Sequence, residues 1–291
     1  MTNVTPPDAT ETLDTPATPD APTLPLPDLG TTNLRLAVEG SLAWLTFDRR
    51  EARNAMTWAM YEGLRRACEW VDRQETIRVL LLQGAGGRAF VAGTDISQFQ
   101  EFVGRDDVLA YERRIEGVLG QLEGVRQPTI ALIQGYAVGA GAAIALTCDL
   151  RVCTPDAQFG IPIARTLGNC LSMGNYARLL RLLGPARTKE IIFTARLVGA
   201  EEAQQAGLAS RVVPAEELEA RGRELALTIA GNAPLTVQVT KEAVRRLLQA
   251  GGAGDGPPDG DDLVLRCYLS EDFQEGVQAF LQKRKPHWRG R

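Results

Sequence analysis

Residues 134–150, QGYAVGAGAAIALTCDL, have the pattern of a strand, a tight glycine turn and a helix. Gly139 and Gly141 let the backbone turn sharply, and the small residues after them allow a helix to start there. Between Tyr136 and Cys148 the stretch contains no acid, base or nucleophile. It therefore predicts a strand-turn-helix unit whose chemistry, if it has any, comes from backbone groups.

Strand and helix patterns alternate on both sides of this unit. IRVLLLQGA (77–85) and TIALIQG (129–135) are continuous apolar runs, which are typical of strands covered on both faces. LRLAVEGSLAWLTFDR (34–49) indicates two short strands, and amphipathic patterns predict helices at 57–73 and 107–125. Beyond residue 175 the pattern is helical. The sequence thus predicts an α/β core followed by a helical part.

The ends of the chain differ in composition from its middle. Thr, Pro, Asp and Ala dominate residues 1–30, which lack an apolar period, so we expect a disordered N-terminal extension over 1–32. We expect the α/β core over 33–225 and a helical C-terminal region over 226–291.

Composition excludes several classes of function. The net charge is −4 with no basic block, which argues against nucleic-acid binding. A single histidine, His287, and five cysteines without C-x-x-C spacing argue against a metal site. No apolar run approaches the roughly 20 residues that span a membrane. The cysteine pattern, with no signal peptide, favours free thiols in a reducing cytoplasm.

Two segments are candidates for backbone chemistry. The helix start after Gly139 presents N–H groups without intrahelical partners, which can bind an anion. GRAFVAGTDISQF (87–99) follows a buried strand and presents a second set of N–H groups. A dinucleotide-binding turn is disfavoured, because Asp149 comes too early for the acid expected about 20 residues further on. Close helix packing alone explains the small residues equally well.

Four segments, in this order and spacing, resemble the crotonase (enoyl-CoA hydratase/isomerase) superfamily. They are FDRREARNAM (47–56), AFVAGTDI (89–96), QGYAVGAGAAIALTCDLRV (134–152) and AQFGIP (157–162). The resemblance implies a spiral of repeated ββα units and a helical C-terminal region that forms a homotrimer or a dimer of trimers. It also implies an acyl-CoA thioester as substrate, with coenzyme A entering as part of the substrate and no separate cofactor.

The same resemblance assigns site residues by position. It implies that the N–H groups of Thr94 and Ala140 hold the thioester oxygen as it becomes an enolate. The residues implied to contact the substrate are Ala52, Arg53, Ala92, Thr94 and Ala140, with Phe280 and Lys283 reaching the CoA nucleotide of a neighbouring subunit.

The sequence departs from the hydratase pattern at two positions. Hydratases of the superfamily carry one glutamate after the glycine turn and another after Q-F-G-x-P. Here those positions hold Ala143 and Ile163. Neither side chain can exchange a proton, so we expect isomerase-like or lyase-like chemistry rather than two-glutamate hydration.

Other residues become candidates for the reactive group. Ser172 is a candidate to position water or to cap a helix, and Cys170 is a candidate nucleophile or a plain thiol. Glu112 and Glu116 are candidate bases or solvated helix charges. Arg165 is a candidate partner for a substrate carboxylate or for a surface acid. The alternative function is a non-catalytic acyl-CoA-binding protein or an oligomeric partner protein.

Overall fold

The computed structural model describes residues 25–100, 104–250 and 258–291. Its core has two sheets, and successive strands between residues 79 and 160 join the larger and the smaller sheet in turn. The larger sheet has the order β1-β2-β3-β5-β7-β10, with strands Leu34–Glu39, Leu42–Phe47, Val79–Gly84, Thr129–Ile133, Leu150–Cys153 and Arg211–Val212. The smaller sheet has the order β4-β6-β8-β9, with strands Ala89–Ala92, Tyr136–Val138, Gln158–Gly160 and Val198–Gly199.

Successive chain segments repeat one unit. The first unit places two antiparallel strands, β1 and β2, in the larger sheet before α1 (Trp58–Arg73). In the later units one strand joins the larger sheet, the next joins the smaller sheet, and a helix follows. These later helices are α2 (Arg105–Gly124), α3 (Ala140–Thr147), and α4 (Ile163–Thr166) with α5 (Met173–Thr194). The predicted spiral of ββα units is therefore confirmed.

Burial explains why the strands read as continuous apolar runs. All residues of β2 and β5 are buried, because each face of the larger sheet is covered. One face packs in the main core with α1, α2 and α3, and the other contacts Leu218 and Ala226 of α7 (Leu218–Ala230). Gly222 lets α7 approach, since a Cβ there would meet Leu132 at 2.5 Å.

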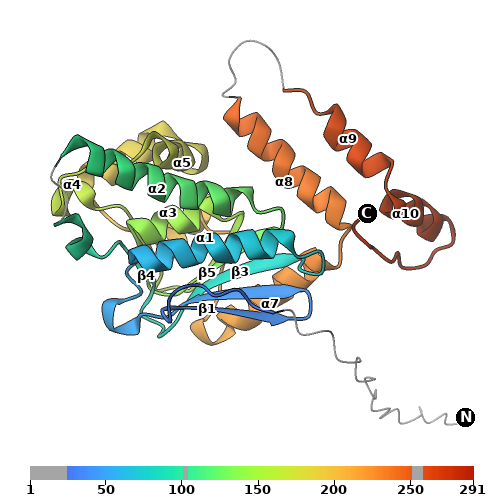
Figure 1. Cartoon of the computed structure of the whole chain (residues 1–291), viewed down its shortest axis with the longest axis horizontal. Helices are drawn as coiled ribbons and strands as arrows, with labels where there is room; N and C mark the ends of the chain where they lie inside the picture. Colours follow the sequence, from blue (N-terminus) through green and yellow to red (C-terminus); the bar gives the residue numbers. More distant parts are fainter. Residues whose placement is uncertain (1–24, 101–103, 251–257) are drawn as a thin grey trace, which may run out of the picture.

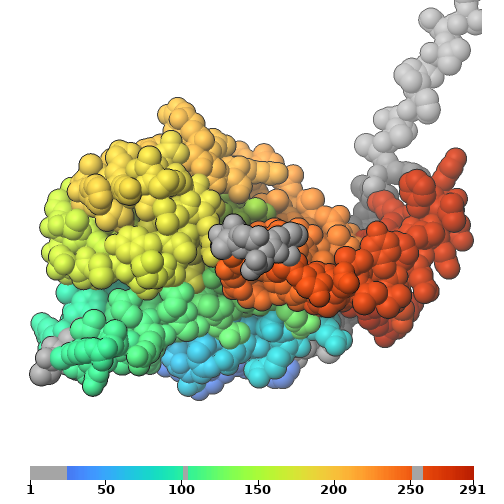
Figure 2. Space-filling model, turned by 90° about the horizontal axis from the view of Figure 1, so that it is seen from above, coloured from blue at the N-terminus to red at the C-terminus, as the bar shows by residue number. Residues whose placement is uncertain are grey.

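The remaining helices complete the chain. They are α6 (Ala200–Gln205), α8 (Pro234–Gln249), α9 (Asp261–Tyr268) and α10 (Glu271–Leu281). Helices α8 to α10 extend to one side of the layered core (Figures 1 and 2). Helix α8 contacts the core through Lys241, which donates to the Gln127 carbonyl at 3.0 Å. On α10, Phe280 and Leu281 are 84% and 75% exposed. A helical C-terminal region is thus present as predicted.

Two predicted boundaries need correction. The disordered extension was expected to reach residue 32, but Leu29 is buried and the Trp70 indole donates to the Pro25 carbonyl at 3.1 Å. Residues 25–32 therefore pack against α1, while the rest of that prediction, residues 1–24, lies outside the described residues. The core was expected to end at residue 225, which falls inside α7. Because Ala226 is buried against the sheet, the core continues to Ala230.

Candidate active site

Two loops meet at one edge of the smaller sheet. Strands β4 and β6 are parallel neighbours, with Ala92 paired to Val138, so the loops that follow them leave the sheet together. Both loops turn through glycines with positive φ, +97° at Gly93 and +57° at Gly139. A Cβ on Gly139 would lie 3.5 Å from the Gly93 Cα. The backbones after the two strands are therefore in close proximity.

Each loop ends in an N–H group that has no acceptor among the described residues. Ala140 is the first residue of α3, where a helix leaves its N–H without an intrahelical partner. Thr94 lies between two bonds that fix its loop, from the Met56 N–H to the Gly93 carbonyl and from the Asp95 N–H to the Met56 carbonyl, both 2.9 Å. Chemically, such a pair can stabilise a developing oxyanion.

Both residues line a cavity of about 250 Å³. The sequence candidates Ala92, Thr94, Ala140, Cys170 and Ser172 all contribute to its wall. The structure thus brings together residues that are up to 80 positions apart along the chain.

The remaining residues that the resemblance implied to contact the substrate do not line this cavity within one chain. The Arg53 carbonyl accepts a bond from the Ala92 N–H at 3.1 Å, so Ala52 and Arg53 are beside the site without lining the cavity. Phe280 lies on α10 and lines a separate groove between the C-terminal helices. Lys283 follows α10. Arg165 is exposed and does not line the cavity.

Two apolar side chains, an alanine and an isoleucine, line the cavity at positions where the resemblance implied glutamates in hydratases. Ala143 faces it from α3 and Ile163 from α4. Ile161, Ile115 and Leu167 extend the apolar lining, while Asn169, Cys170 and Ser172 supply polar groups on the segment before α5. The wall is therefore apolar near α3 and more polar toward α5.

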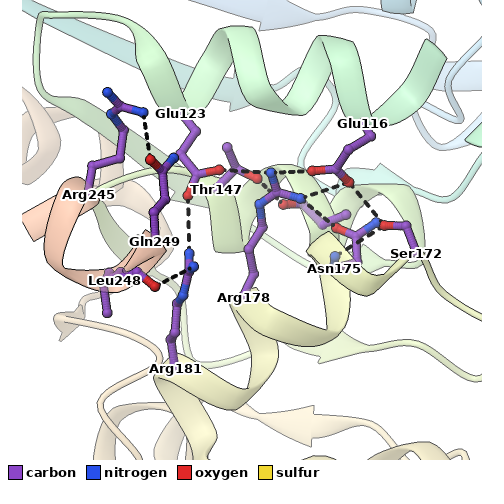
Figure 3. A network of polar contacts seen from close by, with 11 residues as sticks. Glu116, Glu123, Thr147, Ser172, Asn175, Arg178, Arg181, Arg245, Leu248 and Gln249 are labelled. Carbon is purple, nitrogen blue, oxygen red and sulfur yellow. Dashed lines mark hydrogen bonds and ion pairs between the residues drawn. The ribbon is translucent and has the colours of Figure 1, made fainter. Parts of the chain in front are cut away.

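Ser172 begins α5 and also anchors α2. Its hydroxyl accepts from the Asn175 N–H at 3.2 Å and donates to the Glu116 carboxylate at 3.0 Å. Arg178, whose side chain is only 5% exposed, bonds Glu116 and Glu123, each at 2.8 Å (Figure 3). The predicted capping role of Ser172 is confirmed. Glu116 is held in an ion-pair network that joins α2 to α5.

Glu112 lies one turn before Glu116 on α2 but has a different environment. Its side chain lines the cavity and is half-buried. Burial raises the pKa of the Glu112 carboxyl, and the charge of Glu116 raises it further. The structure therefore separates two glutamates that the sequence presented as equivalent candidates.

Two tyrosines were missed by sequence reasoning. The Tyr61 hydroxyl lies 2.7 Å from the Thr94 Oγ1, and Tyr111 also bonds the Thr94 side chain. Both line the cavity, and burial raises the pKa of each phenol. No local motif marks them, because their role depends on how α1 and α2 pack over the Thr94 loop.

A nucleophilic role for Cys170 has no histidine to support it. The thiol is exposed on the cavity wall, and none of the described residues that line the cavity is a histidine. His287 lies near the C-terminus, where its backbone N–H donates to Glu275. Within the described residues there is no cluster of metal-ligating side chains. The helices of the described segments include none long and apolar enough to cross a membrane.

The spiral of ββα units, with a cavity beside two glycine turns, is the architecture of crotonase-like proteins. Comparison with known proteins identifies the family. A family model described as enoyl-CoA hydratase/isomerase matches residues 37–291. The chain therefore belongs to the enoyl-CoA hydratase/isomerase family, the crotonase superfamily, as its sequence motifs predicted. Its members act on acyl-CoA thioesters, and this chain is an enzyme of that family.

Individual relatives cover nearly the whole chain. It is 34% identical to the short-chain-enoyl-CoA hydratase of Clostridium acetobutylicum over 258 residues, covering 87% of this chain and 96% of that protein. It is 34% identical to the 2,3-dehydroadipyl-CoA hydratase of Escherichia coli over 251 residues, covering 85% and 94%. The crystal structure of an enoyl-CoA hydratase from Bacillus anthracis matches with a TM-score of 0.80 and 31% identity, covering 89% of this chain and all of that one.

Proposed function

We propose that this protein stabilises the enolate of an acyl-CoA thioester with the N–H groups of Thr94 and Ala140. The observation that carries the proposal is the geometry of these two groups. Both line one cavity, both belong to loops fixed by neighbouring strands, and neither has an acceptor among the described residues. Preorganised donors of this kind stabilise a developing charge without the cost of reorganising solvent.

We further propose isomerase-like or lyase-like chemistry. The similarity to hydratases predicts glutamates where this chain has Ala143 and Ile163, and both of these side chains line the cavity. Two-glutamate hydration needs an acid and a base on the reacting carbons, which these residues cannot supply. An enolate held by backbone N–H groups serves isomerisation and carbon–carbon cleavage equally well.

The substrate supplies its own coenzyme A in this proposal. Ala52, Arg53 and Ala92 lie beside the Thr94 loop and would hold the CoA chain mainly through backbone groups. The exposed Phe280 and the nearby Lys283 would reach the CoA nucleotide of a neighbouring subunit in a homotrimer or a dimer of trimers. We propose that the enzyme acts in the cytoplasm.

The test compares Ala140→Pro with Ala140→Gly. Proline is accepted at the first position of a helix, so the first variant removes the N–H while α3 can still form. Ala140→Gly keeps the N–H and removes only a methyl group. Turnover of a panel of acyl-CoA thioesters, with binding measured by calorimetry, should fall about 10²–10³-fold in the proline variant. Equal turnover in both variants would contradict the role of Ala140.

The same panel decides the reaction type. It includes crotonyl-CoA for hydration and a 3-enoyl-CoA for isomerisation. Isomerisation without appreciable hydration is expected. Crotonyl-CoA hydration at an ordinary enzyme rate would refute the isomerase or lyase assignment. Tight binding of every thioester with turnover of none would instead favour an acyl-CoA-binding protein.

A further inference from the structure

Helix α2 presents a carboxylate to the cavity. Tyr111, Glu112 and Ile115 of α2 line it, and Glu112 is the single carboxylate among the described lining residues. No described group donates a hydrogen bond to Glu112, and its side chain is half-buried. A carboxylate in this position is therefore free to contact a bound ligand.

The other glutamate on this face of α2 has a structural role. Glu116 bonds Ser172 and Arg178, and Arg178 also bonds Glu123, about two turns further along α2 (Figure 3). A Cβ on Gly174 would lie 2.4 Å from the Glu116 carboxylate, so α5 and α2 approach closely at this point. These contacts fix the helix that carries Glu112 against the wall of the cavity.

We propose that Glu112 is the catalytic residue that moves the proton in this enzyme. The inference rests on the proposed function, because it needs an enolate held by Thr94 and Ala140. Glu112 removes a proton from the α-carbon of the acyl group. The electron pair of the broken C–H bond forms a C=C bond, and the carbonyl electron pair moves onto the thioester oxygen.

The proton then returns from Glu112 to carbon. In isomerisation of a 3-enoyl thioester it is delivered to the γ-carbon, and the electron pair of the dienolate forms the new C–H bond while the C=O bond is restored. One carboxyl thus serves as base and then as acid, so no second glutamate is needed. The step balances without any oxidant or reductant.

The surroundings of Glu112 suit this role. Burial and the charge of Glu116 raise the pKa of Glu112, which brings the carboxyl closer to the pH at which it must both accept and return a proton. Tyr61 of α1 and Tyr111 of α2 face the same cavity as neutral phenols, because burial raises the pKa of both. On α5, Arg178 is engaged by Glu116 and Glu123.

The experiment measures exchange of the α-protons of butyryl-CoA in D₂O by mass spectrometry. This readout needs a base and an enolate but does not require the natural acyl group. Glu112→Gln keeps the size of the side chain and removes its basicity, and exchange should fall by about 10²–10⁴-fold. Butyryl-CoA binding, followed by calorimetry, should stay within a few-fold of that of the unaltered enzyme.

Asp106→Asn is the matched control. Asp106 lies on the first turn of α2 with a side chain that is 98% exposed, so the variant removes the same charge from the same helix away from the cavity. Its exchange rate should equal that of the unaltered enzyme. Glu116→Gln should shift the acidic limb of the exchange rate to lower pH, because it removes the negative charge that raises the pKa of Glu112.

The outcomes separate this inference from the proposed function. Exchange that survives in Glu112→Gln but is lost in Ala140→Pro would overturn the role of Glu112 and leave the enolate site standing. Failure of the unaltered enzyme to exchange α-protons of any bound acyl-CoA would overturn both. Loss of exchange in Glu112→Gln with retained binding and thermal stability supports the assignment.

Discussion

Gly141→Ala tests whether the position of α3 controls the site. Gly141 faces β4, where a Cβ would lie 1.9 Å from the Val91 carbonyl oxygen. That atom belongs to the backbone of a paired strand and cannot rotate away. Restoring even a tight contact of 3.4 Å requires α3 and β4 to separate by about 1.5 Å. Because Ala140 begins the same helix, its N–H would move by a similar distance.

The magnitudes follow from this displacement. Overpacking a close helix-strand contact lowers the free energy of unfolding by about 1–3 kcal/mol. The better helix propensity of alanine offsets only about 0.5–1 kcal/mol of this loss. A 1 Å misplacement of a catalytic group can cost about 10²-fold in rate. We therefore expect a lower midpoint of urea unfolding and at least a 10²-fold loss of α-proton exchange.

Gly120→Ala provides the control for this prediction. Gly120 lies on α2, and a Cβ there would meet nothing within 4 Å. The same substitution should leave exchange unchanged and raise stability slightly. If Gly141→Ala unfolds at the same urea concentration and exchanges protons at the same rate as the unaltered enzyme, close packing of α3 does not position the site.

Three further predictions concern a buried arginine, a cysteine of the cavity wall and an exposed phenylalanine of α10. Arg178→Met should lower the free energy of unfolding, measured by urea titration, by about 1–3 kcal/mol, because two partly exposed carboxylates on α2 lose their partner. Unchanged stability would contradict a role of Arg178 in holding α2 against α5. Cys170→Ser should retain turnover, and loss of turnover would support Cys170 as a nucleophile. In the unaltered protein, iodoacetamide should modify the exposed Cys170 before the buried Cys148, because burial raises the pKa of the Cys148 thiol to about 12. Phe280→Ser should weaken acyl-CoA binding in calorimetry and subunit association in analytical ultracentrifugation, whereas Phe193→Ser on α5 should change neither, although Phe193 is also largely exposed (77% against 84%). Equal effects of the two changes would argue against a contact from the neighbouring subunit.

Much of the fold follows from local patterns. The continuous apolar runs at β3 and β5 and the amphipathic period of α1 depend on residues close in sequence, so they could be recognised without a structure. The domain limits could not, because they depend on packing between distant segments. Residues 25–32 lack an apolar period, yet Leu29 is covered by α1, and the end of α7 is buried by the far face of the sheet.

Part of the candidate site could likewise be predicted from local sequence, and part depends on packing between distant segments. The two loops were predicted from local properties, because glycine turns and a helix start determine where backbone N–H groups are free. The family resemblance then implied Thr94 and Ala140 by position within them. The partners of Thr94 were not predicted, since Tyr61 reaches it only when α1 packs over the loop that follows β4.

The sequence by itself carries the motifs from which the resemblance implied the ββα repeat and the proposed donors Thr94 and Ala140, and it places alanine and isoleucine at positions 143 and 163. Only the tertiary structure decided between Glu112 and Glu116, which lie one turn apart on the same face of α2. Arg178 and Ser172 come from another helix 56 to 62 positions away and bind Glu116, which leaves Glu112 facing the cavity. Spacing along a helix specifies a shared face, but packing of a second helix on part of that face determines which carboxylate remains accessible to substrate.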